Sequence, residues 1–172
     1  VMLWSCLAGV SYGLALATKF SAAPLGVSIV VALLLRWWRE RDWLAAQVTL
    51  IYTSLVVIIA FLIAQPYALL DRQNFAAQVI EQGNLARGML DLPYVRQFAG
   101  TTPFIYQGQN MVLWGMGITL GIAALIGLLW VVWSIWRYRA GLWLVVLSWV
   151  VVYGAIVGSF YVKFMRYMLP LY

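Results

Sequence analysis

Long uncharged apolar stretches alternate with polar connections along the whole chain. A helix needs about 20 apolar residues, within a range of roughly 17 to 25, to cross the hydrocarbon core of a bilayer. Residues 44–64 have this length, and Gln65 and Pro66 end the stretch. The same criterion predicts about five transmembrane helices, at residues 2–18, 21–36, 44–64, 110–136 and 141–161. We therefore expect an all-α, multi-pass integral membrane protein in which residues 1–172 form one transmembrane domain.

The connections between these stretches differ in charge. Residues 36–43 and 137–141 are short and rich in Arg, with Trp and Tyr nearby, as is typical of loops at a lipid headgroup interface. The positive-inside bias places these two loops in the cytoplasm. Lys19, the connection at residues 65–109 and the segment 163–172 then share the extracytoplasmic face, whose six basic residues favour phosphate binding there.

The extracytoplasmic loop at residues 65–109 is polar by comparison and holds three of the five acidic residues. Asp71 is placed to cap a helix, and Phe75 and Val79 then fall on one helical face before Gly83 stops it. The pattern predicts a short amphipathic helix from about residue 72 to residue 82, which we expect to lie along the membrane surface.

The composition indicates a membrane protein and excludes several kinds of catalytic and metal site. Of the 172 residues 65% are hydrophobic and 9% are charged, whereas a soluble domain averages roughly 25% charged residues. The sequence has no His, which excludes Ser-His-Asp catalysis and His-ligated metals within these residues, and Cys6 alone makes neither an internal disulfide nor a Cys-only zinc site. The basic residues are scattered singly between apolar runs, so we expect no nucleic-acid partner.

Glycines four residues apart recur in three apolar stretches, at positions 9 and 13, 117 and 121, and 154 and 158. Small residues one helical turn apart allow two helices to approach closely. We interpret these pairs as packing inside the helix bundle and infer no dimer from them.

Basic side chains at three places in the chain are candidates for binding a phosphate. Lys19 lies between two apolar stretches and is followed by small residues and Pro24, which puts an ammonium on a close-packed turn at the membrane surface. Lys163 and Arg166 lie at the helical spacing i, i+3, and the guanidinium of Arg166 offers a forked pair of donors. Arg96 is a weaker third candidate. The structural alternatives are a lysine that marks a helix end and an arginine that anchors the chain at the interface.

Aromatic and polar side chains of the long loop are candidates for binding a sugar or an acceptor. A pyranose has an apolar face and a rim of hydroxyls, which suits aromatic rings beside acid and amide groups. The candidates are Tyr67, Asp91, Tyr94, Gln97 and Tyr106. The alternative is an ordered surface loop in which Asp91 and Arg96 pair with each other.

Three motifs occur in an order that resembles a family of membrane enzymes. They are GLALATKFSAAP at 13–24, QPYALLD at 65–71 and FMRYMLPLY at 164–172. This order resembles the GT-C class of multi-spanning glycosyltransferases, in particular the dolichyl-phosphate-mannose protein mannosyltransferases of glycosyltransferase family 39 and bacterial relatives such as the aminoarabinose transferases. The stretches PYVRQFAGTTPFIYQ at 93–107 and NMVLWGMGITLGIAALIG at 110–127 are similar to a prokaryotic branch of that group.

The resemblance implies a GT-C-like partial bundle in a prokaryotic plasma membrane. Such an enzyme transfers a sugar, for example mannose, from a polyprenyl-phosphate-linked donor to a protein, lipid or glycan acceptor at the extracytoplasmic face. The donor and the membrane lipids are the implied partners, the acceptor and any need for a divalent metal stay open, and no other cofactor is implied. Lys19, Arg166 and Arg96 then supply the charge that stabilises the departing phosphate.

The acidic motif of the family, expected near the N-terminus of the full-length enzyme, does not occur in this sequence. We therefore expect the chain to be a fragment that lacks the catalytic base, and we assign no catalytic role to Asp71 or Asp91. The alternative from another class is a transporter or a lipid flippase subunit, whose spans commonly contain ionisable residues. The three clearest spans here contain none. A non-catalytic membrane scaffold is the remaining alternative.

The charge bias of the short loops predicts the orientation of the chain. In a variant without Cys6, we expect single cysteines at positions 39 and 137 to be cytoplasmic and those at positions 82 and 91 to be outside. An impermeant maleimide added to intact cells should therefore label only positions 82 and 91. Labelling of position 39 but not of position 82 would reverse the orientation.

Overall fold

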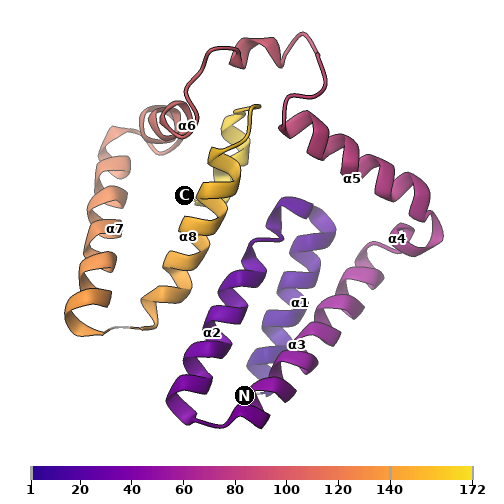
Figure 1. Cartoon of the computed structure of the whole chain (residues 1–172), viewed down its shortest axis with the longest axis vertical. Coiled ribbons are helices and arrows are strands. Elements are labelled where there is room, and N and C mark those ends of the chain that lie inside the picture. Colours follow the sequence, from indigo (N-terminus) through magenta and orange to yellow (C-terminus); the bar gives the residue numbers. More distant parts are fainter. Residues whose placement is uncertain (1, 140, 172) are drawn as a thin grey trace. The chain divides into compact units, whose positions relative to one another are not determined.

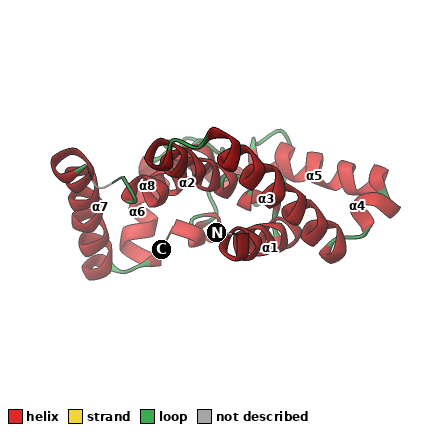
Figure 2. Ribbon diagram, turned by 90° about the horizontal axis from the view of Figure 1, so that it is seen from below, coloured by secondary structure: helices red, strands yellow, loops and turns green. Residues whose placement is uncertain are grey.

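The computed structural model describes residues 2–139 and 141–171, and this part of the chain consists of helices and their connections without a strand (Figure 2). It confirms the predicted all-α class. The chain divides into two compact units, which are described separately. Unit 1 is Val1–Val79 with Leu144–Trp149, and unit 2 is Ile80–Trp143 with Val150–Tyr172.

Unit 1 is built on a hairpin of apolar helices with a further helix packed against it (Figure 1). Its helices are α1 (Met2–Thr18), η1 (Phe20–Ala22), α2 (Leu25–Glu40), α3 (Trp43–Ala64), α4 (Tyr67–Leu70), the first half of α5 (Arg72–Ala86) and residues 144–149 of α8 (Trp143–Gly158). Between α2 and α3, Arg41 adopts a left-handed conformation with φ 57°, and the Asp42 carboxylate accepts a hydrogen bond from the Ala45 amide at 2.9 Å. The two residues thus end one helix and cap the next.

The contact between α1 and α3 depends on glycine. A Cβ atom at Gly13 would lie 2.6 Å from the Val57 carbonyl oxygen and 2.8 Å from the Ala60 Cβ, and one at Gly9 would lie 2.9 Å from Val56 Cγ1. The two helices therefore lie closer than any side chain at these positions would allow. This confirms the interpretation of the first glycine pair as packing within the bundle.

The structure has three helical segments that are long and apolar enough to cross a membrane, among the residues it describes. They are Phe20–Glu40, Trp43–Ala64 and Ile118–Tyr138. The helices Met2–Thr18 and Trp143–Gly158 are apolar but shorter, so the predicted number of five spans is not confirmed. The exposed side chains of all five apolar helices are largely apolar, as expected of helices that have lipid as their solvent.

Unit 2 contains the rest of the long loop and the C-terminal part of the chain. After α5 its elements are η2 (Arg96–Phe98), α6 (Ile105–Asn110), the π-helical turn η3 (Met111–Gly115), α7 (Ile118–Tyr138), the second half of α8 (Trp143–Gly158), η4 (Met165–Tyr167) and η5 (Leu169–Leu171).

Two of these helices do not have the predicted bounds. The span expected at 110–136 is instead α7 at 118–138, because Gly117 has a φ of 79° and separates α7 from the π-helical turn before it. The span expected at 141–161 ends at Gly158, and the residues after it leave the helix. An apolar stretch predicts a helix but not the glycine at which the backbone breaks it.

The helix predicted from about residue 72 is present as α5, and the Asp71 carboxylate caps it by accepting from the Asn74 amide at 3.4 Å. The expected stop at Gly83 is wrong, since the helix continues to Ala86. Gly88, with a φ of 75°, is the left-handed residue that stops the helix after Ala86. The Gly88 amide donates to the Leu85 carbonyl and the Met89 amide to the Asn84 carbonyl, both at 2.9 Å, which is the Schellman pattern.

A small hydrophobic core in unit 2 joins the end of α5 to the segment after α8. The Ala86 carbonyl accepts hydrogen bonds from the amides of Tyr161 and Val162 at 3.0 and 3.2 Å. The buried core residues are Leu85, Val95, Phe98 and Val162, with Leu90, Leu92, Tyr106, Phe164 and Tyr167 packed against them. Residues 80–109 of the long loop are therefore an ordered, folded part of unit 2.

The glycine contact predicts a position-specific effect on stability. Gly13→Ala would force α1 away from α3, and we expect it to lower the free energy of unfolding by about 1–3 kcal/mol. Gly127→Ala in α7 is the control, because a Cβ there meets nothing within 4 Å and alanine favours a helix. Thermal unfolding in detergent checks this, and equal midpoints for the two variants would contradict the close contact.

Candidate functional site

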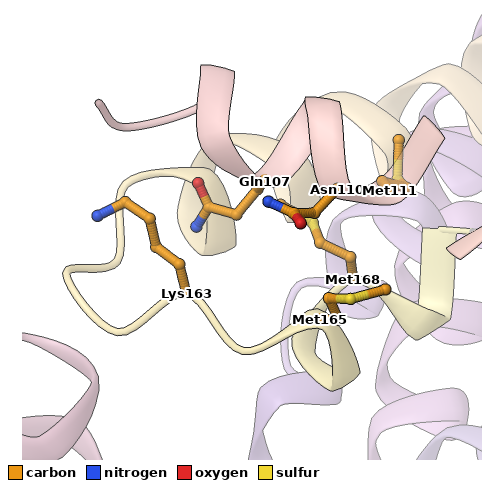
Figure 3. Close-up of a pocket in the computed structure, with 6 residues that line it drawn as sticks. All are labelled: Gln107, Asn110, Met111, Lys163, Met165 and Met168. Atoms are coloured by element: carbon orange, nitrogen blue, oxygen red, sulfur yellow. The ribbon is translucent and has the colours of Figure 1, made fainter. Parts of the chain in front are cut away.

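A shallow hollow in unit 2 brings polar side chains of α6 against the C-terminal segment (Figure 3). We name it the Lys163 hollow, and it is lined by Gln107, Asn110, Met111, Lys163, Met165 and Met168. It has about 200 Å³ of space when its open mouth is counted, but the side chains leave no room inside for a water molecule. The hollow therefore has no interior space for a ligand in this structure, and a ligand enters only if side chains move.

The side chain of Gln107 fixes α6 against the end of α8. Gln107 is 3% exposed, and its Nε2 donates to the Val157 carbonyl at 2.9 Å while its Oε1 accepts from the Phe104 amide at 3.2 Å. The ring of Phe104 covers Gly158 so closely that a Cβ there would clash with it. The wall of the hollow that α6 supplies is thus held by hydrogen bonds and by a glycine contact.

Lys163 is a buried cation on the side of the hollow that the segment after α8 supplies. It is 4% exposed, its Nζ donates to the Tyr161 carbonyl at 3.0 Å, and it lies 5.5 Å from the centroid of the Tyr161 ring. In the described parts of the chain, no carboxylate lies within ion-pair distance of it. Burial lowers the pKa of this lysine, because the low-dielectric surroundings disfavour its charged form.

Arg166 differs from Lys163 in its surroundings. It is exposed, and its guanidinium carbon lies 4.7 Å from the centroid of the Phe164 ring and 5.7 Å from that of Tyr167. The expected helical spacing between Lys163 and Arg166 is wrong, since residues 163 and 164 are not helical and only Met165–Tyr167 form a 3-10 turn. The two cations therefore do not lie together on one helical face.

Asp91 and Arg96 bind each other. The Arg96 Nε and Nη2 atoms donate to the two carboxylate oxygens of Asp91 at 2.7 and 2.6 Å. The guanidinium lowers the pKa of Asp91, and the carboxylate raises the pKa of Arg96. Both side chains are largely exposed, at 72% and 69%, so this is the pair expected of an ordered surface loop.

The other sugar-site candidates differ in how much of their surface is available. Tyr94 is 48% exposed and lies 6.1 Å from Phe164 between ring centroids, and the Gln97 Nε2 donates to the Tyr94 carbonyl at 2.7 Å. Tyr106 packs edge-on against Phe98 in the core of unit 2. Tyr67 is 64% exposed at the start of α4.

The two units divide the candidates between them. Asp91, Arg96 and Arg166 belong to unit 2 together with the other loop candidates except Tyr67. Tyr67 and Lys19 belong to unit 1, where Lys19 is exposed in the turn between α1 and η1. Within the described residues no group of three or more His, Cys, Asp or Glu is placed to hold a metal ion.

A scan against protein-family models, a search of curated proteins and a search of solved structures each found no match. The chemistry of the site therefore has to be argued from its own residues.

The polar neighbours of Lys163 were not predicted from the sequence. The sequence singles out Lys163 only because it is three residues before Arg166. Gln107 is 50 residues away from the Val157 carbonyl that it binds, and no local pattern indicates such a contact. In the sequence, the only indication of this site is that an amide and a lysine occur in otherwise apolar segments.

The exposed ion pair of the loop predicts a small effect on stability. Asp91→Asn removes the pair but leaves the core intact, so we expect the thermal midpoint of unfolding to be nearly unchanged. Phe98→Ala, in the same loop, removes a ring that is 3% exposed and should lower the free energy of unfolding by about 3–5 kcal/mol. Unfolding of the purified protein followed by circular dichroism measures both. A loss for Asp91→Asn as large as that for Phe98→Ala would show that the pair holds the loop together.

Proposed function

We propose that this chain is part of a membrane glycosyltransferase of the GT-C kind, similar to the protein mannosyltransferases. It transfers a sugar from a polyprenyl-phosphate-linked donor to a protein, lipid or glycan acceptor at the extracytoplasmic face of a prokaryotic plasma membrane. The observation that carries the proposal is the exposed guanidinium of Arg166, which lies on the rings of Phe164 and Tyr167 just after the apolar helix α8.

An arginine in this position suits the phosphate of a lipid-linked sugar. The aromatic rings restrict the guanidinium, so less side-chain freedom is lost when it binds. Its planar fork donates two parallel hydrogen bonds to a phosphate. The neighbouring apolar helix provides a surface for the hydrocarbon chain of the same molecule.

The proposed bundle has five crossings. The three long apolar helices each have the length of a span, and α1 and α8, with 17 and 16 residues, cross with the help of flanking residues. The loop at residues 65–109 then lies outside, and membrane lipids surround the apolar faces. In support of an enzyme rather than a transporter or flippase, the charged residues of the three long helices lie only at their ends, at Arg36, Arg39, Glu40 and Arg137.

The reaction exchanges one bond at the anomeric carbon of the sugar for another. The acceptor hydroxyl attacks this carbon, the bond to the phosphate oxygen breaks, and the hydroxyl proton passes to a base that we do not assign to Asp71 or Asp91. Negative charge builds on the leaving phosphate, where a preorganised cation contributes most to the rate. We assign this role to Arg166, and we keep Lys19 and Arg96 as further phosphate-binding candidates.

Residues of the long loop are proposed to bind the sugar or the acceptor. The exposed ring of Tyr94 can stack on the apolar face of a pyranose, and Gln97 and Tyr106 of the same unit offer hydrogen-bonding groups. The exposed ring of Tyr67, in unit 1, is a separate stacking candidate. Asp91 and Arg96 use their charged groups on each other, so either reaches a ligand only when their exposed pair opens.

The proposal predicts the activity of variants at Arg166 in the full-length protein. Arg166→Ala should lower turnover with a polyprenyl-phosphate sugar by about 100-fold, the order of loss when one donor to a developing charge is removed. Arg166→Lys should recover only part, because a point charge does not replace the planar fork. Lys19→Ala should lower donor use in the same direction. Turnover is normalised to folded protein.

The control is Arg72→Ala, which removes an exposed cation from α5 that we place outside the site. Its turnover should match that of the unmodified protein. Unchanged turnover per folded molecule in Arg166→Ala and Lys19→Ala would leave interface anchoring as the role of these residues. Movement of a labelled lipid across vesicles without sugar transfer would favour the flippase instead.

A further inference from the structure

Two arginines end helices in a backbone conformation that usually belongs to glycine. Arg41, in the α2–α3 turn (residues 36–43), has a φ of 57°, and Arg139, in the α7–α8 turn (residues 137–143), has a φ of 50°. A left-handed residue at a helix end is more favourable as glycine, because a Cβ atom makes this conformation costly. An arginine at both places favours a role for its side chain, since a glycine would fit the backbone better.

The α2–α3 turn has positive charge that its own carboxylates do not neutralise. Its two acidic residues are already engaged, because Glu40 pairs with the Arg36 Nε atom at 2.8 Å and Asp42 caps α3. Arg39 and Arg41 are exposed, and neither forms an ion pair with any residue that the structure describes. These two guanidinium groups are therefore available to a partner.

The α7–α8 turn has the same character with a different sequence. It contains two arginines and no acidic residue. Arg137 and Arg139 are both exposed, and in the described part of the chain no carboxylate pairs with either. The Arg137 guanidinium carbon lies 5.8 Å from the centroid of the Tyr138 ring. A left-handed arginine and a second exposed arginine thus occur in both turns.

Exposed aromatic rings flank both turns. Trp38 and Trp43 at the first turn and Trp136 and Tyr138 at the second are each more than half exposed. Such rings, which have an apolar body and a polar N–H or O–H group, favour the level of the lipid headgroups. The helices α2, α3 and α7 that adjoin the turns belong to segments long and apolar enough to cross a membrane. Unpaired guanidinium groups at this level match headgroups of opposite charge.

We propose that the α2–α3 and α7–α8 turns bind the headgroups of anionic phospholipids, with Arg41 and Arg139, together with Arg39 and Arg137, as counter-charges. A bilayer surface presents many headgroups, so the guanidinium groups do not have to converge on one ligand. The partner is a lipid and not a soluble anion, because the rings and apolar helices beside each turn offer a surface to the acyl chains of the same molecule. This binding does not require that the chain transfers a sugar.

The test uses the full-length protein in micelles of a neutral detergent, with phosphatidylglycerol or phosphatidylcholine of the same acyl chains added. A ligand that binds only the folded state raises the midpoint of thermal unfolding. Phosphatidylglycerol should raise the midpoint further than phosphatidylcholine, whose choline neutralises its phosphate. This extra rise should shrink as salt is added, because salt screens exposed charges.

The decisive variant combines Arg41→Gly with Arg139→Gly. In phosphatidylcholine it should be at least as stable as the unmodified protein, because glycine suits the left-handed backbone. It should lose about half of the extra rise in phosphatidylglycerol, since two of the four exposed cations are removed. If the glycine variant does not fold, Arg39→Gln with Arg137→Gln makes the same comparison without changing the left-handed positions.

The control combines Arg72→Gln with Arg87→Gln, which removes two exposed cations outside the turns and lowers the net charge equally. It should keep the extra rise. The proposal would be overturned by equal midpoints in the two lipids, by a variant of the turns that keeps the extra rise in full, or by a control that loses it as well. A rise of the same size with inorganic phosphate would also overturn it, because the partner would then be a soluble anion.

Discussion

The carbonyl of Ala86 is the point on which the arrangement of unit 2 depends. Ala86 is the last residue of α5, and its carbonyl accepts hydrogen bonds from the amides of Tyr161 and Val162. These bonds join the long polar loop to the segment that follows α8. Gly88 makes this approach possible, because it takes a positive φ and has no side chain where the Tyr161 ring lies. Once the two segments are joined, Val162 is buried in the core and Lys163 follows it into the interior.

This arrangement gives two nearby cations different properties. Lys163 is buried against the carbonyl and the ring of Tyr161, where its charge is poorly solvated and its pKa is lowered. Arg166 lies outside the interior, on two aromatic rings, with its donors accessible. A guanidinium keeps its charge in either place, but an ammonium is the group whose protonation responds to burial. The same short segment thus offers an exposed forked donor and a buried point charge.

Unit 1 depends on a different constraint, the close approach of α1 and α3 at Gly9 and Gly13. Helices with lipid as solvent gain little from burying apolar side chains, so the van der Waals contact of their backbones matters more. The glycine spacing predicted this contact in α1. The same spacing at Gly117 and Gly121 serves another purpose, because Gly117 breaks the helix and only Gly121 packs closely, against Val112. A spacing therefore indicates that small residues are needed, but not what each of them contacts.

The sequence by itself determined the helical class, the apolar stretches, the cap at Asp71 and the position of the polar loop between these stretches, because these depend on the length and period of local patterns. Only the tertiary structure decided where α5 ends and where α7 begins and ends, that Asp91 and Arg96 bind each other, and that Gln107 reaches the Val157 carbonyl. It also decided that Lys163 is buried and Arg166 exposed. The physical reason is that burial and hydrogen bonding arise from contacts between segments far apart in the chain, and local periodicity contains no information on these.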